Sequence, residues 1–316
     1  MQTDLSIIIP TLNEENYLPG LLDAISRQTW PPLEIIVADA GSSDQTVEVA
    51  QKAGCRVVPG GRPARGRNAG VAVARGDIFL FLDADVKPEA WFLAHALAEF
   101  NRRGLDVATC PVKPLEGNLI DAVFHETANV FMQAIRPVSP HAPGFCIFAR
   151  RQAHQNIGGF DETLLMSEDH DYVRRITAQR GRFGILHFPI TVSVRRLQTD
   201  GRWNVALRYA FLSANQMLGN HFNQALLDRY LGEYRFGDHQ PNDFHRQAQY
   251  YSSVQHIGQI TLSSVRRSAN DAKLYTYAFV GRIQPWLVEN HNNKPPNGKP
   301  ARINVISNVD EDHNAG

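Results

Sequence analysis

Residues 77–85 read DIFLFLDAD, in which the unbroken apolar run IFLFL is followed by two carboxylates separated by an alanine. A run that is apolar at every position, rather than at alternate ones, is typical of a strand buried on both faces of a parallel sheet. We therefore predict a strand over Asp77–Leu82, with Asp83 and Asp85 at its carboxyl end. In an open parallel sheet ligands bind outside those carboxyl ends, so the same stretch indicates where a functional site lies.

Other apolar runs alternate with helical segments, which predicts an α/β fold: a Rossmann-like, mostly parallel sheet flanked by helices. The predicted strands in the first half are Leu5–Pro10, Leu33–Asp39 and Cys55–Pro59, and the helices are Glu15–Gln28, Asp44–Lys52 and Ala64–Arg75. The second half is less regular. There we predict strands over Val107–Cys110 and Phe145–Arg150, helices over Leu119–Ala134 and from Glu168, and a strand-like run over Phe183–Ile190.

Length and composition set the expected domain organisation. The chain has 316 residues, 43% of them apolar, which is enough for one main domain with an appendage. We expect the α/β domain over residues 1–200 and a helical C-terminal extension over residues 201–289, whose stretch 202–218 has apolar residues at helical spacing. That stripe most simply packs on the main domain; membrane-interface binding and a homodimer contact are the alternatives. Residues 290–316 have the composition of a disordered tail.

Charge and cysteine content narrow the class of protein. Thirty-two basic residues balance thirty-two acidic ones, so no global field favours nucleic acid as a partner. The three cysteines are far apart in apolar surroundings, which indicates buried thiols in a reducing compartment. No apolar stretch approaches the roughly 18 residues of a membrane helix. We expect a cytoplasmic protein without a transmembrane segment, at most peripheral at a membrane.

The Asp83-Ala84-Asp85 motif predicts a divalent metal site. Carboxylate oxygens are the ligands that Mg²⁺ and Mn²⁺ prefer, and such ions often bridge one or two carboxylates to the phosphates of a substrate. The alternative is a solvated turn, because two aspartates at this spacing are common by chance. His187 is a candidate third ligand, although a lone histidine in an apolar strand is more often a core residue.

Polar side chains at the other strand ends are candidates for ligand binding. Asp39 can accept hydrogen bonds from a base edge or a ribose, and Asn13 either contacts a ligand or caps a helix. Arg67, at the start of a predicted helix, suits phosphate oxygens, whereas most surface arginines are simply solvated. Glu168 and Asp169 open another helix, where negative charge is favoured by the helix dipole, but where a carboxylate can also serve as a general base.

The order of four segments resembles one known family. IIIPTLNEE (7–15), VADAGSSDQT (37–46), RGRNAGVAVARGDIFLFLDAD (65–85) and GGFDETLLMSED (158–169) together look like the inverting family 2 glycosyltransferases with the GT-A fold. The resemblance covers about residues 5–200. It implies a nucleotide-sugar site formed by Pro10, Thr11, Asn13, Glu14, Asp39, Arg67, Asp83 and Ala84. It also implies that Asp85 is the principal metal ligand, with Asp83 beside it, and that Asp169 of the Glu168-Asp169 pair is the catalytic base.

The chain departs from the family pattern in two places. Ala40 stands where relatives often have a second aspartate. Gln198, Arg202 and Trp203 resemble the Gln-x-x-Arg-Trp motif of processive, membrane-embedded members, but they are spaced one residue wider. A polymer synthase is therefore not expected. The neighbouring pair Arg195-Arg196 either holds a phosphate or an acceptor, or is simply solvated.

The resemblance implies an inverting transfer of a sugar from a nucleotide diphosphate to an acceptor hydroxyl, with Mg²⁺ or Mn²⁺ as cofactor. A UDP-sugar is the expected donor by family frequency and a GDP-sugar the alternative, while the acceptor is an unidentified sugar, lipid-linked molecule or small molecule. Two other functions remain open. A non-catalytic sugar-nucleotide-binding protein would keep the donor site without a base, and a sugar nucleotidyltransferase would require a glycine-rich basic loop where this chain has TLNEEN.

Overall fold

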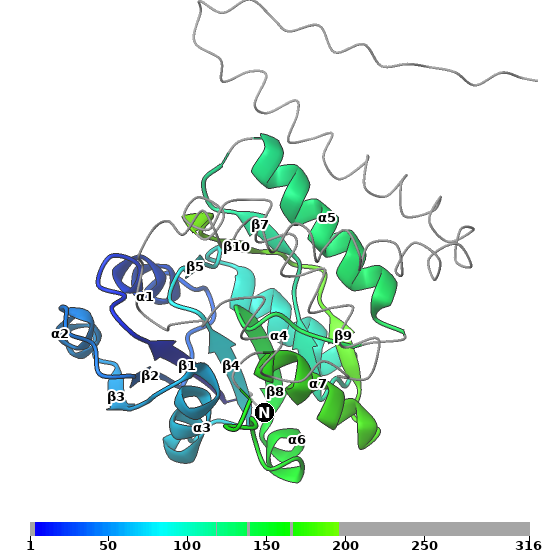
Figure 1. Ribbon diagram of the computed structural model, residues 1–316, viewed down its shortest axis with the longest axis horizontal. Coiled ribbons are helices and arrows are strands. Elements are labelled where there is room, and N and C mark those ends of the chain that lie inside the picture. The colour runs from blue at the N-terminus through cyan, green and yellow to red at the C-terminus, as the bar shows by residue number, and fades with distance from the viewer. Residues whose placement is uncertain (1–3, 118, 138–139, 165–166, 196–316) are drawn as a thin grey trace, which may run out of the picture.

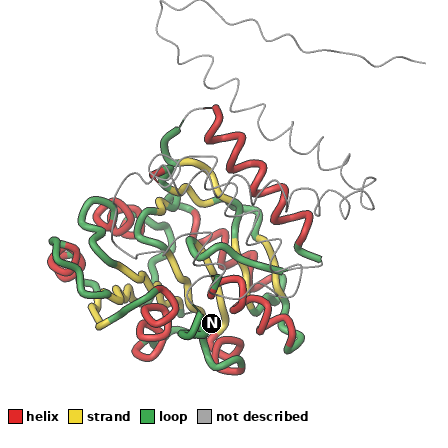
Figure 2. The backbone as a smooth tube through the Cα atoms, viewed as in Figure 1, coloured by secondary structure: helices red, strands yellow, loops and turns green. Residues whose placement is uncertain are grey.

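The computed structural model describes residues 4–195, apart from residues 118, 138–139 and 165–166. Within this part strands and helices alternate along the chain, as the apolar runs predict (Figure 2). The predicted extension over residues 201–289, the tail over residues 290–316, and the motif from Gln198 to Trp203 lie outside the described residues. Among the helices of the described part, none combines the length and the apolar composition of a membrane span.

Seven strands form the main sheet, in the order β3-β2-β1-β4-β8-β6-β9 (Figure 1). Their bounds are β1 Leu5–Thr11, β2 Glu34–Asp39, β3 Arg56–Pro59, β4 Ile78–Leu82, β6 Val107–Thr109, β8 Cys146–Arg150 and β9 Phe183–Ile185. Neighbouring strands are parallel except around β8, which runs antiparallel to both β4 and β6. The predicted mostly parallel α/β sheet is therefore confirmed.

Helices cover both faces of this sheet because its central strands are apolar on both sides. From β1, Ile7 and Ile9 pack into a core with α1 (Leu18–Ser26), α2 (Thr46–Lys52) and α4 (Phe92–Arg102). Ile8, between them, packs into a second core with α3 (Pro63–Val73), α6 (Arg151–Asn156) and α7 (Glu168–Ala178). The result is a three-layer arrangement, helix, sheet and helix, in which the loops after β1, β2 and β4 lie at one end (Figure 1).

A smaller sheet continues from the end of β4 in the order β5-β10-β7, with bounds β5 Val86–Lys87, β7 Val112–Pro114 and β10 Ile190–Val192. Helix α5 (Leu119–Ile135) packs beside β7, where Asn129 hydrogen-bonds both the N–H and the C=O of Val112. Antiparallel pairing of β5 with β10 ties the segment that follows β10 to the Asp83-Ala84-Asp85 turn.

The prediction of one strand over Phe183–Ile190 is wrong. The segment divides between β9 in the main sheet and β10 in the smaller sheet, with residues 186–189 linking them. Pro189 supplies a physical reason, because proline has no backbone N–H to donate to a sheet ladder.

Candidate functional site

The loops after β1 and β2 are joined through the carboxylate of Asp39. It accepts hydrogen bonds from the Thr11 hydroxyl at 3.1 Å, from the Ser42 hydroxyl at 2.5 Å, and from the backbone N–H groups of Gly41 and Ser42 at 2.9 and 2.8 Å. A carboxylate has about four lone-pair positions, so these donors occupy most of its capacity. Asp39 therefore holds the two loops together, and its contact with a base or ribose stays a prediction.

Asn13 also links the two loops. Its side-chain oxygen accepts a hydrogen bond from the backbone N–H of Ser43 at 2.9 Å, and its own N–H donates to the Ser42 hydroxyl at 2.9 Å. The residue has a left-handed backbone conformation with φ 53°, which asparagine tolerates better than most residues. Helix α1 begins later, with Tyr17 at its N-cap, so Asn13 does not cap it. Its predicted contact with a nucleotide stays untested.

The Asp83-Ala84-Asp85 turn follows β4, whose five residues are all buried. Ala84 points into the core and is 3% exposed, while each flanking aspartate meets an arginine. Asp83 lies 3.4 Å from Nη2 of Arg67, and Asp85 lies 2.9 Å from Nε of Arg195. The two carboxylates are thus placed by a rigid strand, and each is already paired with a positive charge.

Arg67 connects the end of β4 with the start of α7. The glycine-containing face of α3 lies close against β1, since a Cβ at Gly66 would be 3.1 Å from Cβ of Pro10. That approach buries the Arg67 side chain, which donates to Oε1 of Glu168 at 2.6 Å and also contacts Asp83. Burial alone lowers the pKa of Arg67, but Glu168, Asp83 and the nearby Asp169 together raise it. Arg67 is therefore a permanent positive charge among three carboxylates.

Glu168 and Asp169 open α7 as predicted, but Ser167 does not cap the helix with its side chain. Ser167 has φ 61°, and the Asp169 carboxylate accepts the backbone N–H of His170 at 2.8 Å instead. Burial raises the pKa of Glu168, the neighbouring Asp169 raises it further, and Arg67 opposes both. The ion pair fixes Glu168 on Arg67, so of the two carboxylates Asp169 is the better placed to meet a substrate.

Gly144 is part of this cluster, although nothing in the sequence pattern distinguishes it. Its carbonyl lies 3.4 Å from Nη2 of Arg67. A Cβ built on Gly144 would lie 2.5 Å from that nitrogen and 3.2 Å from Oδ2 of Asp169. The absence of a side chain at this position is what allows Arg67 and Asp169 to lie side by side.

Gly144→Ala should therefore disturb the cluster. The added methyl group must push aside a buried, ion-paired arginine, an overpacking cost of about 1–3 kcal/mol in unfolding free energy. Displacement of the Asp169 carboxylate by as little as about 1 Å can cost on the order of 100-fold in rate. Denaturant unfolding and a transfer assay measure the two effects. Gly20→Ala in α1 is the control, because a Cβ there meets nothing within 4 Å; equal behaviour of the two variants would contradict the packing argument.

Arg195 brings the first and fourth strand ends together. Its two terminal nitrogens pair with the two carboxylate oxygens of Glu14, both at 2.8 Å, and its Nε faces Asp85. Its guanidinium also lies over the Tyr17 ring, 4.3 Å from the centroid. The sequence leaves open whether Arg195 binds a ligand or is simply solvated, and it does not indicate the pairing with Glu14, because 181 positions separate the two residues.

His187 is not brought together with Asp83 and Asp85. It follows β9, is exposed, and makes its hydrogen bonds with Glu99 of α4: its ring Nδ1 lies 2.6 Å from Oε1, and its N–H donates to Oε2 at 3.0 Å. Burial raises the pKa of Glu99, but its hydrogen bonds with His187 and Arg103 hold it below the usual value. Among the described residues no group of three or more His, Cys, Asp or Glu side chains is arranged to hold a metal. Within the described part of the chain, a metal at this position would meet the two aspartates.

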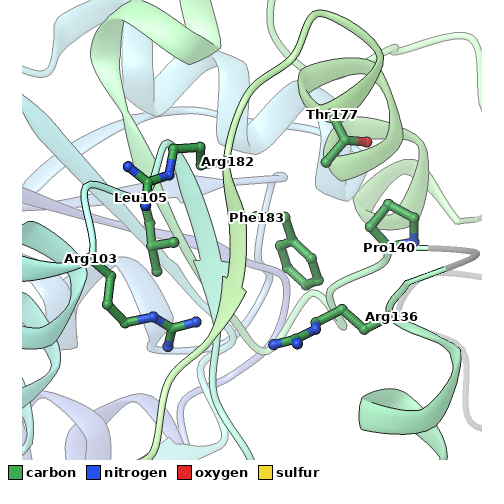
Figure 3. Close-up of a pocket in the computed structure, with 7 residues that line it drawn as sticks. All are labelled: Arg103, Leu105, Arg136, Pro140, Thr177, Arg182 and Phe183. Carbon is green, nitrogen blue, oxygen red and sulfur yellow. The ribbon is translucent and has the colours of Figure 1, made fainter.

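A cavity of about 510 Å³ lies at the other end of α7 from Glu168. Figure 3 shows the side chains that line it: Arg103, Leu105, Arg136, Pro140, Thr177, Arg182 and Phe183. None of the residues predicted to bind donor or metal is among them. The candidate site is therefore the convergence of side chains at the carboxyl ends of β1, β2 and β4, together with the start of α7.

Comparisons with known proteins bear on the family and on the fold. The model of the family "Glycosyl transferase family 2" matches residues 6–158. The poly(ribitol-phosphate) β-N-acetylglucosaminyltransferase TarS of Staphylococcus aureus is 27% identical over 193 residues, which is 57% of this chain and 34% of that protein. The chain thus spans about a third of the length of this relative.

Two solved structures are similar in fold. S. aureus TarS 1-349 in complex with UDP-GlcNAc superposes with a TM-score of 0.51 and 21% identity, over 78% of each chain. The mannosyltransferase PcManGT from Pyrobaculum calidifontis, in complex with GDP-Man and Mn²⁺, superposes with a TM-score of 0.56 and 20% identity, over 92% of this chain and 84% of that one. At these identities the likeness establishes the fold.

Proposed function

Because this chain belongs to glycosyl transferase family 2, we propose that it transfers a sugar, with inversion, from a nucleoside diphosphate to the hydroxyl group of an acceptor. The TarS and mannosyltransferase structures contain UDP-GlcNAc and GDP-Man respectively, which supports a sugar nucleotide as donor. Of the two, a UDP-sugar is the donor we propose first.

One observation carries the proposal: Arg67 contacts both Asp83, at the end of β4, and Glu168, at the start of α7. Arg67 thereby joins two pairs of carboxylates at the same end of the sheet. Asp83 and Asp85 suit a metal, and the Glu168-Asp169 pair suits a general base. Nε of Arg67 is buried without a hydrogen-bond partner among the described atoms. Buried donors of this kind are rare.

The two aspartates fit a divalent cation by their chemistry. Asp85 already attracts a positive group, the Arg195 guanidinium, and Asp83 adds a second hard oxygen ligand from the same turn. Mg²⁺ or Mn²⁺ bound there would stabilise, as a Lewis acid, the charge that develops on the leaving diphosphate. Mn²⁺ is present in the mannosyltransferase structure of similar fold.

In this proposal Asp169 accepts the proton of the acceptor hydroxyl as its oxygen attacks the anomeric carbon. Attack comes from the face opposite the diphosphate, so the configuration inverts. Glu168, paired with Arg67, keeps the start of α7 in position, and Arg67 supplies a fixed positive charge close to the leaving group. Positioning of both substrates and electrostatic support of the leaving group provide most of the rate enhancement.

A panel of UDP- and GDP-sugars tests this function. With Mn²⁺ present, the true donor should stabilise the folded protein by about 2.7 kcal/mol at 100 times its dissociation constant, seen as a rise in melting temperature. It should also be hydrolysed slowly to free nucleoside diphosphate, because water can replace the acceptor. Stabilisation without hydrolysis would identify a non-catalytic sugar-nucleotide-binding protein, and no stabilisation by any member of the panel would reject the donor site.

A further inference from the structure

We propose that Arg195 is a built-in counter-ion that occupies the cation position at Asp85 until the donor arrives, so that divalent metal binds together with the donor diphosphate and not before it. This inference rests on the proposed function, because it concerns the order in which that site is filled. It assigns Arg195 a part in donor and metal binding through its competition with the metal.

The fold places Arg195 at this position through a continuous ladder. β5 follows the Asp83-Ala84-Asp85 turn directly and pairs with β10, and beyond β10 the N–H of Ser193 donates to the backbone carbonyl of Asp85 at 3.0 Å. The Ser193 hydroxyl in turn accepts the N–H of Arg195 at 3.2 Å. Backbone hydrogen bonding that starts at Asp85 therefore holds Arg195 next to the Asp85 side chain.

The Arg195 guanidinium contacts a different carboxylate along each of two edges. Its two terminal nitrogens form a bidentate pair with Glu14, and Nε faces Oδ2 of Asp85 at 2.9 Å. All three side chains are largely buried, with exposed fractions of 20% for Arg195, 15% for Glu14 and 8% for Asp85. The Tyr17 ring adds a cation-π contact. Arg195 thus offsets one of the two negative charges of Glu14 and Asp85 and lies between carboxylates that would otherwise repel each other at a partly dehydrated site.

A divalent ion and Arg195 compete for Asp85. Mg²⁺ binds carboxylate oxygens at about 2.0–2.1 Å, and Oδ2 of Asp85 already faces the Arg195 guanidinium. Two cations at one buried carboxylate also repel each other strongly, because the local dielectric constant is low. The charge of Arg195 therefore opposes the metal at Asp85 and weakens metal binding in the absence of donor.

The donor removes this obstacle. Its diphosphate offers oxygens that an arginine binds in a bidentate manner, so Arg195 exchanges a carboxylate for a phosphate. The same diphosphate supplies the metal with ligands that the described protein groups do not. Metal and donor therefore bind cooperatively, and the coupling is reciprocal: each raises the affinity for the other by the same factor.

The test is the affinity of the donor-free protein for Mn²⁺, measured by calorimetry or by the EPR signal of free Mn²⁺. Arg195→Gln removes the competing charge, so Mn²⁺ should bind at least about tenfold more tightly than to the wild type, the equivalent of one charge-assisted hydrogen bond. Arg27→Gln is the matched control: it removes the same charge from an exposed pair with Asp23 on α1 and should leave Mn²⁺ affinity unchanged.

Addition of UDP or GDP gives the second readout. The wild type should show a larger increase in Mn²⁺ affinity on nucleotide addition than Arg195→Gln does. A smaller nucleotide-induced increase in Arg195→Gln could also result from the loss of a contact between Arg195 and a phosphate. A higher Mn²⁺ affinity of this variant in the absence of nucleotide could not. Arg195→Lys keeps the positive charge but lacks the planar guanidinium group. Its donor-free Mn²⁺ affinity should therefore lie between those of the wild type and Arg195→Gln. This variant replaces Arg195→Gln in the test if the glutamine variant does not fold.

The outcomes separate this inference from the proposed function. If Asp85→Ala abolishes Mn²⁺ binding but neither Arg195 variant strengthens it, the counter-ion role is wrong and the metal site stands. If Asp85→Ala binds Mn²⁺ as the wild type does, the metal site of the proposed function is itself wrong. Tight donor-free Mn²⁺ binding by the wild type, unaffected by Arg195→Gln, would also overturn the inference.

Discussion

Asp169→Asn should reduce kcat for sugar transfer by about 10²- to 10⁴-fold, the usual contribution of a general base, while donor affinity stays close to that of the wild type. Asparagine has the same shape and its side-chain oxygen can still accept the N–H of His170, which Asp169 accepts at 2.8 Å. It cannot take up a proton. The loss should therefore appear in the chemical step and not in the folding of α7.

Asp171→Asn is the control for this variant. Asp171 lies two residues further along the same helix and pairs with Arg174 and Arg175, both at 2.6 Å. The same chemical change there removes helix ion pairs without touching the cluster around Arg67, so transfer should persist. Turnover by Asp169→Asn within a few-fold of the wild type would exclude Asp169 as the base. An equal loss in both variants would indicate damage to the helix.

The strand ends were predictable because their signal is local. IFLFL is apolar at every position, so β4 and the turn that follows it could be located from the chain alone, as could β1 and β2. A local signal for α4 also exists, since Leu93, Ala96, Leu97 and Phe100 recur at helical spacing and are buried, yet α4 is not among the predicted elements. Helix α4 follows a region where the strand pattern ends, and its N-cap residue, Trp91, is not a residue type that indicates a helix start.

The contacts that make the site were not predictable, because they join residues far apart in the chain. Arg67 and Glu168 are separated by 101 positions, and Arg195 and Glu14 by 181. The motifs placed the right residue types at the right strand ends, but pairwise distances depend on how the layers pack. His187 illustrates the limit: its apolar surroundings gave no indication that β9 would place it against Glu99 of α4.

The pairing of arginines with the acidic turn changes how the metal site is understood. Two carboxylates after a buried strand suggest an open binding site for a cation, whereas in the structure Arg67 engages Asp83 and Arg195 engages Asp85. Burying charge is costly unless it is paired, so these arginines also allow the acidic turn to fold without metal. In the proposed order of binding, the metal takes the place of Arg195 at Asp85. The affinity for the metal then depends on the contacts that Arg195 makes with the donor phosphate.

Asp85→Ala should eliminate metal-dependent donor binding. The side chain is 8% exposed and is held at the end of a buried strand, where it is the principal metal ligand of the proposed site. Mutating groups that merely support metal ligands typically costs about 10- to 100-fold in affinity, so loss of a ligand itself should cost more. Calorimetry with a UDP-sugar, with and without Mn²⁺, measures the difference.

Asp77→Ala is the matched control for Asp85→Ala, because Asp77 precedes the opposite end of β4 and is exposed. It should bind donor and Mn²⁺ as the wild type does. In Asp85→Ala the donor should bind equally weakly with or without Mn²⁺, and removing metal from the wild type with EDTA should reproduce that weak binding. If Mn²⁺ still strengthens donor binding in Asp85→Ala as much as in the wild type, the cation is held elsewhere. The buried pair with Arg195 would then serve only to join the turn to the segment after β10.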